Sequence, residues 1–219
     1  MNTEKQKKYM DGVLRLNEFI NLTAITDPDE CYIKHTLDSL VCLDYPEFKG
    51  AKTVIDVGTG AGFPGMPLAI ECPDKKFVLM DSLLKRLKVI DELAAETGVS
   101  NIETVHGRAE ELGKNKAHRE KYDVCISRAV SNLATLSEYC LPFIKVGGYL
   151  LAYKGPDAEN EIRDAKKAIS VLGGKVTEVR EAKLEEYGIS HNVVIIEKVK
   201  STPAKYPRKA GTPLKEPIR

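Results

Sequence analysis

One short stretch of the chain, residues 53–65, limits the possible folds more than any other. It reads TVIDVGTGAGFPG, in which β-favouring apolar residues lead into four glycines within eight positions. This pattern predicts a short buried strand, a glycine turn and then a helix. Glycine tolerates positive φ and has no Cβ, so the backbone amides of such a turn can close on a ligand. Because the amides that open a helix favour an anion, the stretch predicts a nucleotide-type cofactor loop.

Two cofactor classes fit this loop. Gly60, Gly62 and Gly65 satisfy the dinucleotide pattern G-x-G-x-x-G, which favours NAD. The run from Asp56 to Gly62, D-x-G-x-G-x-G, instead resembles the first motif of methyltransferases that use S-adenosylmethionine (SAM). A glycine-rich turn without a ligand is a third interpretation, although four close glycines would weaken a purely structural turn. Asp56 favours SAM, and the choice between NAD and SAM depends on the residues that follow the loop.

Composition limits the classes of protein that remain. The 219 residues are enough for one α/β domain with modest extensions, and the net charge of +1 gives no sign of a nucleic-acid partner. Five scattered cysteines without C-x-x-C spacing disfavour zinc and disulfides, so we expect no metal. The N-terminus lacks the apolar region of a signal peptide, and no apolar run approaches the ~20 residues of a membrane span. We therefore expect a soluble cytoplasmic protein with no membrane attachment.

Apolar periodicity predicts an order of helices and strands along the chain. Two helices are expected before the loop, over residues 1–20 and from about residue 27 to residue 43. Seven strands are expected at 53–57, 76–80, 102–106, 122–127, 149–153, 175–181 and 193–199. The helices between them are expected at 65–72, 83–97, 133–143 and 157–172, with a short one opening after Gly107. This alternation predicts an α/β fold with a seven-stranded, mostly parallel sheet and helices on both faces.

The ends of the predicted strands supply the candidate site residues, because ligands of such sheets bind outside the carboxyl ends of the strands. These residues are Gly58, Gly60, Gly62, Asp81, Ala109, Glu110, Arg128 and Lys154. Two further strands after the fifth are what SAM methyltransferases add to the doubly wound plan, whereas a nicotinamide domain is usually followed by a substrate domain. The whole pattern therefore favours a Rossmann-like class I methyltransferase.

Each cofactor candidate also has a purely structural interpretation. Asp81 lies about twenty residues after the glycines, where an acid accepts both ribose hydroxyls, but it can instead cap the helix that starts near Leu83. The corner at residues 107–110 is where an adenine would lie, and Glu110 or neighbouring amides could meet its edge. Glu110 can equally be a first-turn acid that the helix dipole favours. Phe63 lines the pocket or simply packs.

The two ends of the chain supply the candidates for contact with RNA. His35 lies near Asn21 and Thr23, although a lone histidine on a helix is more often a surface residue. From Lys198 onward there are seven lysines or arginines, one acid and four prolines. This composition predicts an irregular arm that orders on RNA and follows its phosphates, and a merely solvated tail is the alternative. The predicted RNA-binding residues are Asn21, Thr23, His35, Lys154, Lys205, Arg208 and Lys209.

Three regions follow from these patterns. We expect an N-terminal helical extension at 1–48 that packs on the core, a methyltransferase domain at 49–200 and a basic, proline-rich C-terminal arm at 201–219. Removal of the residues after Lys200 is then expected to leave SAM affinity near normal and to reduce methyl transfer to RNA greatly.

Seven sequence motifs together resemble one known family. They are NLTAITDPDECYIKHTLDSL, VIDVGTGAGFPGMPLAI, LMDSLLKR, GRAEEL, ISRAV, AYKG and KYPRKAGTPLKEPI. In this order, and over nearly the whole chain, they are similar to the RsmG (GidB, glucose-inhibited division protein B) family. The tail departs from the family pattern at Ala210, Leu214 and Glu216.

The resemblance implies a bacterial methyltransferase that modifies N7 of one guanine in 16S ribosomal RNA, in the free RNA or in a small-subunit precursor. The implied cofactor is SAM, with S-adenosylhomocysteine as its product. The resemblance also implies SAM contacts at Gly58, Phe63, Asp81, Ala109, Glu110 and Arg128.

This chemistry explains why the sequence contains no obvious catalytic dyad. Guanine N7 carries a lone pair and no proton, so methyl transfer needs alignment and exclusion of water rather than a general base or a metal. Arg128 and Lys154 are the catalytic candidates. A bidentate arginine on O6 and N7 would occupy the methylated atom, so we expect Arg128 to bind the cofactor carboxylate, an RNA phosphate or a protein carboxylate. Lys154 binds a phosphate at the rim or is a solvated lysine at a strand end.

Two other functions remain open at this stage. An NAD-dependent oxidoreductase is supported by G-x-G-x-x-G and Asp81 alone, and a non-catalytic RNA-binding or ribosome-assembly factor would use the same fold without transfer. We expect a monomer with no obligate protein partner.

Overall fold

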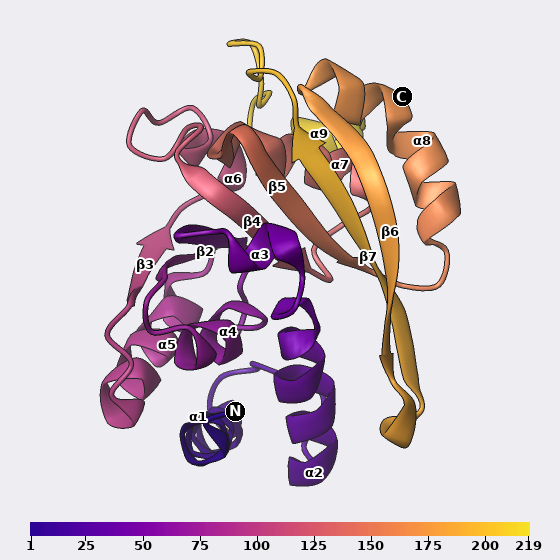
Figure 1. The fold of residues 1–219 in the computed structure, drawn as a ribbon. Coiled ribbons are helices and arrows are strands. Elements are labelled where there is room, and N and C mark those ends of the chain that lie inside the picture. Colours follow the sequence, from indigo (N-terminus) through magenta and orange to yellow (C-terminus); the bar gives the residue numbers. More distant parts are fainter. The chain divides into compact units, whose positions relative to one another are not determined.

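The computed structural model describes the backbone of residues 1–219 and every side chain except that of residue 185. The chain forms two compact units, Met1–His106 and Gly107–Arg219, each of which combines strands with helices (Figure 1). The units are defined by packing, and the three regions expected from the sequence stay a prediction.

The first unit contains three parallel strands in the order β3-β2-β1. The strands are β1 (Thr53–Val57), β2 (Lys76–Asp81) and β3 (Ile102–His106). The helices of this unit that flank the strands are α1 (Thr3–Asn17), α4 (Gly65–Glu71) and α5 (Leu84–Thr97). Val54, Ile55 and Leu79 are buried, as expected for strands covered on both faces. Helix α5 ends at Gly98, which takes the left-handed conformation with φ +64°.

The N-terminal part differs from the two long helices that the sequence predicts. Helix α1 stops at Asn17, whose side-chain oxygen accepts the amides of Leu22 and Thr23 at 2.8 and 3.0 Å and so closes a turn. The predicted second helix is divided into α2 (Pro28–Cys31), the π-helical η1 (Tyr32–Leu37) and the 3-10 helix η2 (Leu40–Cys42). A further short helix, α3 (Pro46–Lys49), lies in the predicted connection. The segment is therefore a series of short helical elements of different types rather than one continuous α-helix.

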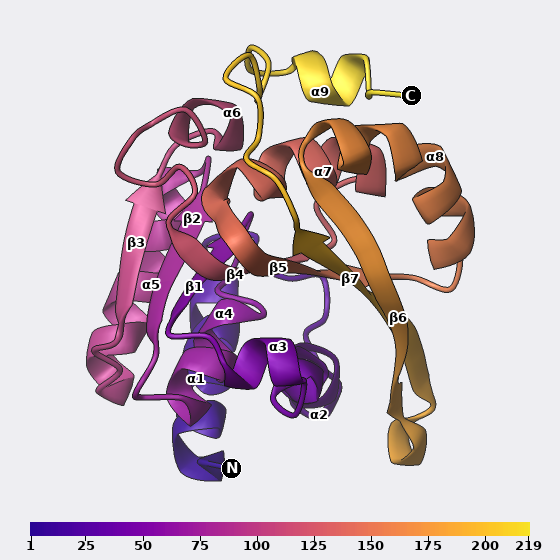
Figure 2. The same ribbon diagram turned by 45° about the horizontal axis from the view of Figure 1, so that its top comes forward.

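The second unit contains four strands in the order β4-β5-β7-β6. They are β4 (Tyr122–Arg128), β5 (Ile144–Lys154), β6 (Gly174–Leu184) and β7 (Ile189–Lys198). The helical elements are α6 (Ala109–Leu112), α7 (Leu133–Cys140), η3 (Leu141–Phe143), α8 (Ala158–Val171), η4 (Glu185–Tyr187) and α9 (Thr212–Lys215). Strands β4 and β5 are parallel, and β7 is antiparallel to both β5 and β6. Figure 2 shows the β6–β7 hairpin extending away from α8.

Strand β5 begins earlier than the sequence predicts. It includes Gly147 and Gly148, which the sequence pattern places in a turn before the strand. A register shift between β4 and β5 accompanies them, and Gly147 has φ +86°. The two glycines therefore form an irregular part of the strand rather than its boundary.

The C-terminal segment, defined here as residues 201–219, belongs to the second unit and packs against the rest of it. Thr202, Pro207 and Pro213 are buried, and α9 forms a short helix beside α7 (Figure 2). The expectation of a wholly irregular arm is therefore wrong, because side chains of α6 and α7 hold this segment, as described below.

Candidate functional site

The glycine loop of the first unit takes a backbone conformation that explains its composition. Gly58, Gly60 and Gly62 have φ values of +76°, +60° and +90°, which L-residues with a Cβ rarely adopt. A Cβ at Gly62 would collide with the hydroxyl of Tyr9, whereas a Cβ built at Gly60 meets no atom within 4 Å. The loop is therefore tightly packed at Gly62 and open at Gly60.

Asp56 holds this loop from inside the protein. Its side chain is fully buried, and Oδ2 accepts the Gly65 amide at 2.9 Å and the Thr59 hydroxyl at 2.7 Å. A Cβ at Gly65 would collide with the side chain of Leu79. The acid of the motif thus shapes the turn, a role that the sequence pattern alone does not reveal, and the last glycine permits close packing of α4 on β2.

Asp81 contacts the glycine loop, the residue that precedes α5 and Arg86. Its Oδ2 accepts the Gly60 amide at 3.0 Å, and its Oδ1 accepts the Leu83 amide at 2.8 Å, next to the start of α5. Arg86 lies 3.6 Å from Oδ2. Asp81 thus binds the amide of Leu83, although Leu83 is the N-cap residue of α5 and the helix has no side-chain cap. A carboxylate has about four acceptor positions, so these contacts leave capacity for ribose hydroxyls, and that contact stays a prediction.

Aromatic residues from the N-terminal part cover the glycine loop. The rings of His35 and Phe63 stack with centroids 4.9 Å apart, and Tyr9 meets Phe63 edge to face at 5.9 Å. The Tyr9 hydroxyl donates to the Ala61 carbonyl at 2.8 Å. Burial, with the nearby charge of Asp56, raises the pKa of Tyr9, which therefore stays a neutral donor. Tyr9 is a site residue that the sequence analysis missed, since helical periodicity marks it only as core.

The structure brings together two of the three predicted RNA-binding residues of the N-terminal part. Thr23 Oγ1 and His35 Nε2 are 2.7 Å apart, and His35 belongs to the π-helical turn η1, a kind of turn that is frequent at functional sites. Asn21 is exposed. Because His35 is held between Thr23 and Phe63, its ring is fixed beside the glycine loop.

Ala109 and Glu110 open the short helix α6 of the second unit. The Glu110 side chain is 4% exposed, and its Oε1 accepts the Gly211 amide at 2.8 Å. Glu110 is an acid of the first turn of α6, and its carboxylate also binds the C-terminal segment. Contact of this corner with an adenine stays a prediction.

Arg128 and Lys154 end neighbouring strands of the second unit. Arg128 is partly exposed at the end of β4, and the next residue, Ala129, has φ +56°. The Lys154 side chain is buried, so the solvated interpretation is wrong for it. Its Nζ donates to the Ser131 carbonyl at 2.5 Å and pairs with Glu161 at 2.8 Å. Lys154 thus anchors the segment between β4 and α7.

The basic residues of the C-terminal segment have different surroundings. Lys205 and Lys209 are exposed and available to phosphates. The Arg208 guanidinium is instead in a bidentate ion pair with Glu138, with its shortest contact at 2.7 Å. Its predicted role in RNA binding therefore finds no support in this geometry, although it stays untested.

The residues that the structure describes include neither a membrane-spanning helix nor a metal-binding group. No helix among them is both long enough and apolar enough to span a bilayer. The residues whose side chains are described contain no group of three or more histidine, cysteine, aspartate or glutamate side chains placed to hold a metal ion.

Comparison with known proteins identifies the family. The family model GidB, described as rRNA small subunit methyltransferase G, matches residues 2–191. The "Ribosomal RNA small subunit methyltransferase G" of Alkaliphilus metalliredigens (strain QYMF) is 52% identical over 96% of this chain and 88% of its own length. The protein of the same name from Clostridium novyi (strain NT) is 50% identical over 96% of this chain and 87% of its own length.

A solved structure shows the fold class. The O-methyltransferase TomG from Streptomyces achromogenes, which is involved in tomaymycin synthesis and was solved in complex with SAM, matches with a TM-score of 0.59 and 16% identity over 90% of each chain. This likeness, with the seven strands described above, confirms the Rossmann-like class I methyltransferase fold expected from the sequence. TomG was solved with SAM, the cofactor class whose first motif the run from Asp56 to Gly62 resembles. From the glycine loop to the full-length relatives, the observations agree that this chain belongs to the GidB family of rRNA small subunit methyltransferase G proteins.

Proposed function

We propose that this chain is a SAM-dependent methyltransferase that places a methyl group on N7 of a specific guanine in 16S ribosomal RNA. The observation that carries the proposal is the 52% identity with an rRNA methyltransferase over 96% of this chain. The substrate is the free RNA or a small-subunit precursor, so the protein acts in the bacterial cytoplasm. We infer that it works as a monomer.

The residues of the glycine loop fit SAM. Gly60 is open to a ligand at a positive φ that brings its backbone to the surface of the loop, and Asp81 lies against the same residue. Close approach of backbone amides and an acceptor for ribose hydroxyls are what an adenosyl group needs. We propose that SAM contacts a set of residues predicted from the sequence, namely Gly58, Gly60, Gly62, Phe63, Asp81, Ala109, Glu110 and Arg128.

Bound SAM supplies the methyl group on a sulfonium, which makes the remaining thioether a good leaving group. Guanine N7 has a lone pair and no proton, so the protein has no proton to remove before transfer. The work of the chain is to orient the reacting atoms and to exclude water. Tyr9 and His35 serve this task by fixing the glycine loop and Phe63.

Two basic residues at the strand ends have separate roles. Arg128 is proposed to bind the cofactor carboxylate or an RNA phosphate, because a bidentate grip on O6 and N7 would block methylation. Lys154 is proposed to act through the segment that it anchors at Ser131 rather than by touching the substrate. Lys205 and Lys209 are proposed to contact RNA phosphates, which orient the substrate without reading its sequence.

The proposal is tested by incubating the protein with SAM labelled in its methyl group and either free 16S rRNA or small ribosomal subunits. We expect label in the RNA at a single guanine position, and a Gly60→Val variant, which blocks the open side of the loop, should transfer much less. Absence of label with both substrates, while the wild-type protein still binds S-adenosylhomocysteine, would favour a non-catalytic RNA-binding protein instead.

A further inference from the structure

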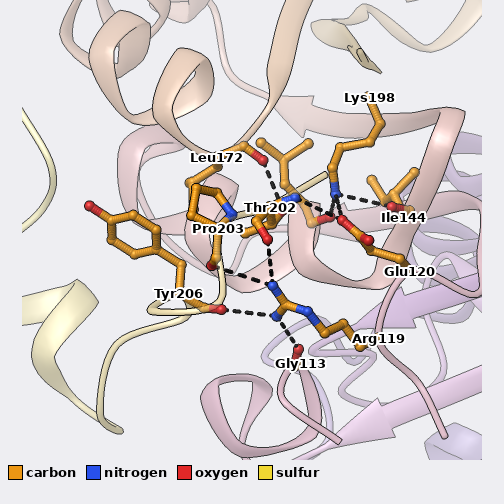
Figure 3. Close-up of polar contacts among 10 residues, drawn as sticks. Gly113, Arg119, Glu120, Ile144, Leu172, Lys198, Thr202, Pro203 and Tyr206 are labelled. Atoms are coloured by element: carbon orange, nitrogen blue, oxygen red, sulfur yellow. Dashed lines mark hydrogen bonds and ion pairs between the residues drawn. The ribbon is translucent and has the colours of Figure 1, made fainter. Parts of the chain in front are cut away.

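One arginine fastens the beginning of the C-terminal segment to the second unit. The Arg119 guanidinium donates to the carbonyls of Gly113, Tyr206 and Thr202 at 2.8, 2.9 and 2.7 Å (Figure 3). Gly113 directly follows α6, so this single side chain binds both α6 and the segment. Because a guanidinium has five N–H donors in a rigid plane, the three carbonyls are held in fixed relative positions.

An ion pair between a buried lysine and a partly exposed glutamate adjoins this arginine. Glu120 Oε1 accepts the Thr202 amide at 2.7 Å and lies 3.2 Å from Nζ of Lys198 (Figure 3). Lys198 is fully buried and also donates to the carbonyls of Leu141 and Ile144 at 2.5 and 3.0 Å. Glu120 has φ +51°, a conformation that a residue other than glycine keeps only where its surroundings hold it. The chain therefore leaves β7 in a fixed direction.

A second ion pair fastens the middle of the segment to α7. Arg208 donates to both carboxylate oxygens of Glu138, with Nε–Oε1 at 3.0 Å and Nη2–Oε2 at 2.7 Å. The Arg208 amide donates to Glu138 Oε1 at 2.7 Å. Glu138 is 1% exposed, and Arg208 of the segment supplies the positive charge that compensates its carboxylate. Thr135 adds a bond from Oγ1 to the Pro213 carbonyl at 3.0 Å.

These anchors lead to the predicted cofactor corner. The backbone amide of Gly211 reaches Glu110 at the start of α6. Gly211 has φ +83°, and the bond at Arg208 lies only three residues before it. Glu110 follows Ala109, and both come directly after the end of β3, where the parallel arrangement predicts adenine binding. The segment therefore contacts Glu110, the residue that defines this corner.

We propose that the C-terminal segment is a positioning element for the cofactor, which holds Glu110 and the first turn of α6 in the conformation that SAM requires. This inference rests on the proposed function and goes beyond it, because it gives the segment a role in cofactor binding besides contact with RNA. It also replaces the expectation that removal of the residues after Lys200 leaves SAM affinity unchanged.

Thermodynamic linkage gives the proposal a reciprocal consequence. If the docked segment strengthens cofactor binding, then bound cofactor must strengthen docking of the segment by the same factor. Binding of S-adenosylhomocysteine to the full chain should therefore slow amide hydrogen exchange in residues 203–216. A segment that serves only the stability of the fold, or only RNA binding, does not predict this response.

The direct test removes the middle anchor without leaving a buried charge. A double variant, Glu138→Met with Arg208→Met, replaces the ion pair by apolar side chains, a change that is often neutral for folding. Arg15→Met with Glu96→Met removes an ion pair of the first unit and serves as the matched control. We expect the affinity for S-adenosylhomocysteine, measured by calorimetry, to fall by about fivefold or more in the first variant and to stay unchanged in the control.

A second variant keeps the test decisive if the double variant does not fold. Thr135→Val retains the shape of a buried side chain and removes only its bond to Pro213, so it should weaken cofactor binding by a smaller factor. Unchanged affinity in every variant that folds, together with unchanged exchange of residues 203–216 on adding S-adenosylhomocysteine, would overturn the inference. A wild-type protein that does not bind S-adenosylhomocysteine would instead count against the proposed function.

Discussion

At the scale of single residues, the glycine loop depends on one side chain outside its motif, Tyr9, and on the acid within it, Asp56. Tyr9 donates to the Ala61 carbonyl from a different helix, and the collision that a Cβ at Gly62 would cause is with the same hydroxyl. Asp56 holds the other side of the turn through the Gly65 amide. The conformation that brings Gly60 to the open side is thus fixed by two buried oxygen atoms.

Replacement of Tyr9 by phenylalanine tests this dependence. The variant leaves the Ala61 carbonyl without this donor, and we expect a loss of about 1–2 kcal/mol in the free energy of unfolding. The affinity for S-adenosylhomocysteine should fall severalfold because the loop is less well fixed. Tyr122→Phe, which removes a hydroxyl bonded to His118 in the second unit, is the control. Equal cofactor affinity in the two variants would show that Tyr9 does not position the loop.

Lys198 gives a prediction for pH dependence. Burial lowers the pKa of Lys198 from 10.5 to about 8, against the opposing effect of Glu120. Between these values the unfolded chain binds a proton that the folded chain does not, so this group makes stability rise with pH. The free energy of unfolding of the wild type minus that of a Lys198→Met variant should be level below about pH 7 and should increase from pH 8 to pH 10. Urea titrations of both proteins measure this difference in the free energy of unfolding. A difference that falls from pH 8 to pH 10 would show that the pKa of Lys198 is not lowered in the folded protein.

Some residue roles could be predicted from the sequence and others could not. Gly58, Gly60 and Gly62 follow from their spacing, because positive φ is a local property of the backbone. Tyr9 and Glu138 act through partners 52 and 70 positions away, respectively. Periodicity marks such residues as core and carries no information about which carbonyl or cation they meet.

At the scale of elements, buried side chains hold the segment that follows a strand end. Lys154 ends β5 and holds Ser131, in the segment between β4 and α7. The same Glu161 oxygen that pairs with Lys154 accepts the Leu133 amide at 2.7 Å, at the start of α7. A lysine and a glutamate thus fix the direction in which the chain leaves β4, next to Arg128.

A Lys154→Met variant should separate transfer from cofactor binding. Loss of the anchor lets the segment after Arg128 shift, and misplacement by about 1 Å can reduce turnover about a hundredfold. We expect kcat for rRNA methylation to fall between tenfold and a hundredfold by this reasoning, with affinity for S-adenosylhomocysteine within about twofold of the wild type. Lys145 lies on β5, like Lys154, and pairs with Asp123 of β4. Lys145→Met removes this pair and should leave both quantities unchanged. A fall in cofactor affinity as large as the fall in kcat would place Lys154 in the cofactor site.

The prediction of elements succeeded where the local sequence pattern is clear. Strand β3 has the bounds expected from its sequence, and α5 ends at the glycine that marks its end. The π-helical turn η1 was not predicted, because its apolar spacing differs little from that of an α-helix. Helix α9 was not predicted either, since four prolines in a basic segment are typical of irregular structure and its order depends on contacts with α7.

At the scale of the whole molecule, family membership and fold agree on a methyltransferase, and the C-terminal segment has a buried side and an exposed side. Its buried side contacts Arg119, Glu138 and Glu110, while Lys205 and Lys209 are exposed. One segment can therefore position the cofactor corner through its anchored side and contact RNA phosphates through its exposed lysines.

Charge removal on the exposed side tests the contact with RNA. Lys205→Ala with Lys209→Ala should weaken binding to 16S rRNA and reduce the magnitude of the slope of log K against log salt concentration by about 1 to 2. The reason is that binding releases about one counterion fewer for each phosphate contact that is lost. Affinity for S-adenosylhomocysteine should not change. Lys166→Ala with Lys167→Ala, which changes the net charge equally on α8, is the control. An identical salt slope in the wild type and both variants would exclude Lys205 and Lys209 from the RNA-binding surface.

The central claim is that this chain methylates guanine N7 of 16S rRNA with SAM as donor. Its most direct test is mass spectrometry of nucleosides from 16S rRNA, or from small subunits, after reaction with SAM that carries a trideuterated methyl group. Transfer to guanine N7 predicts trideuterated 7-methylguanosine and no other labelled nucleoside. Label on another atom or another base, or none from either substrate, would contradict it.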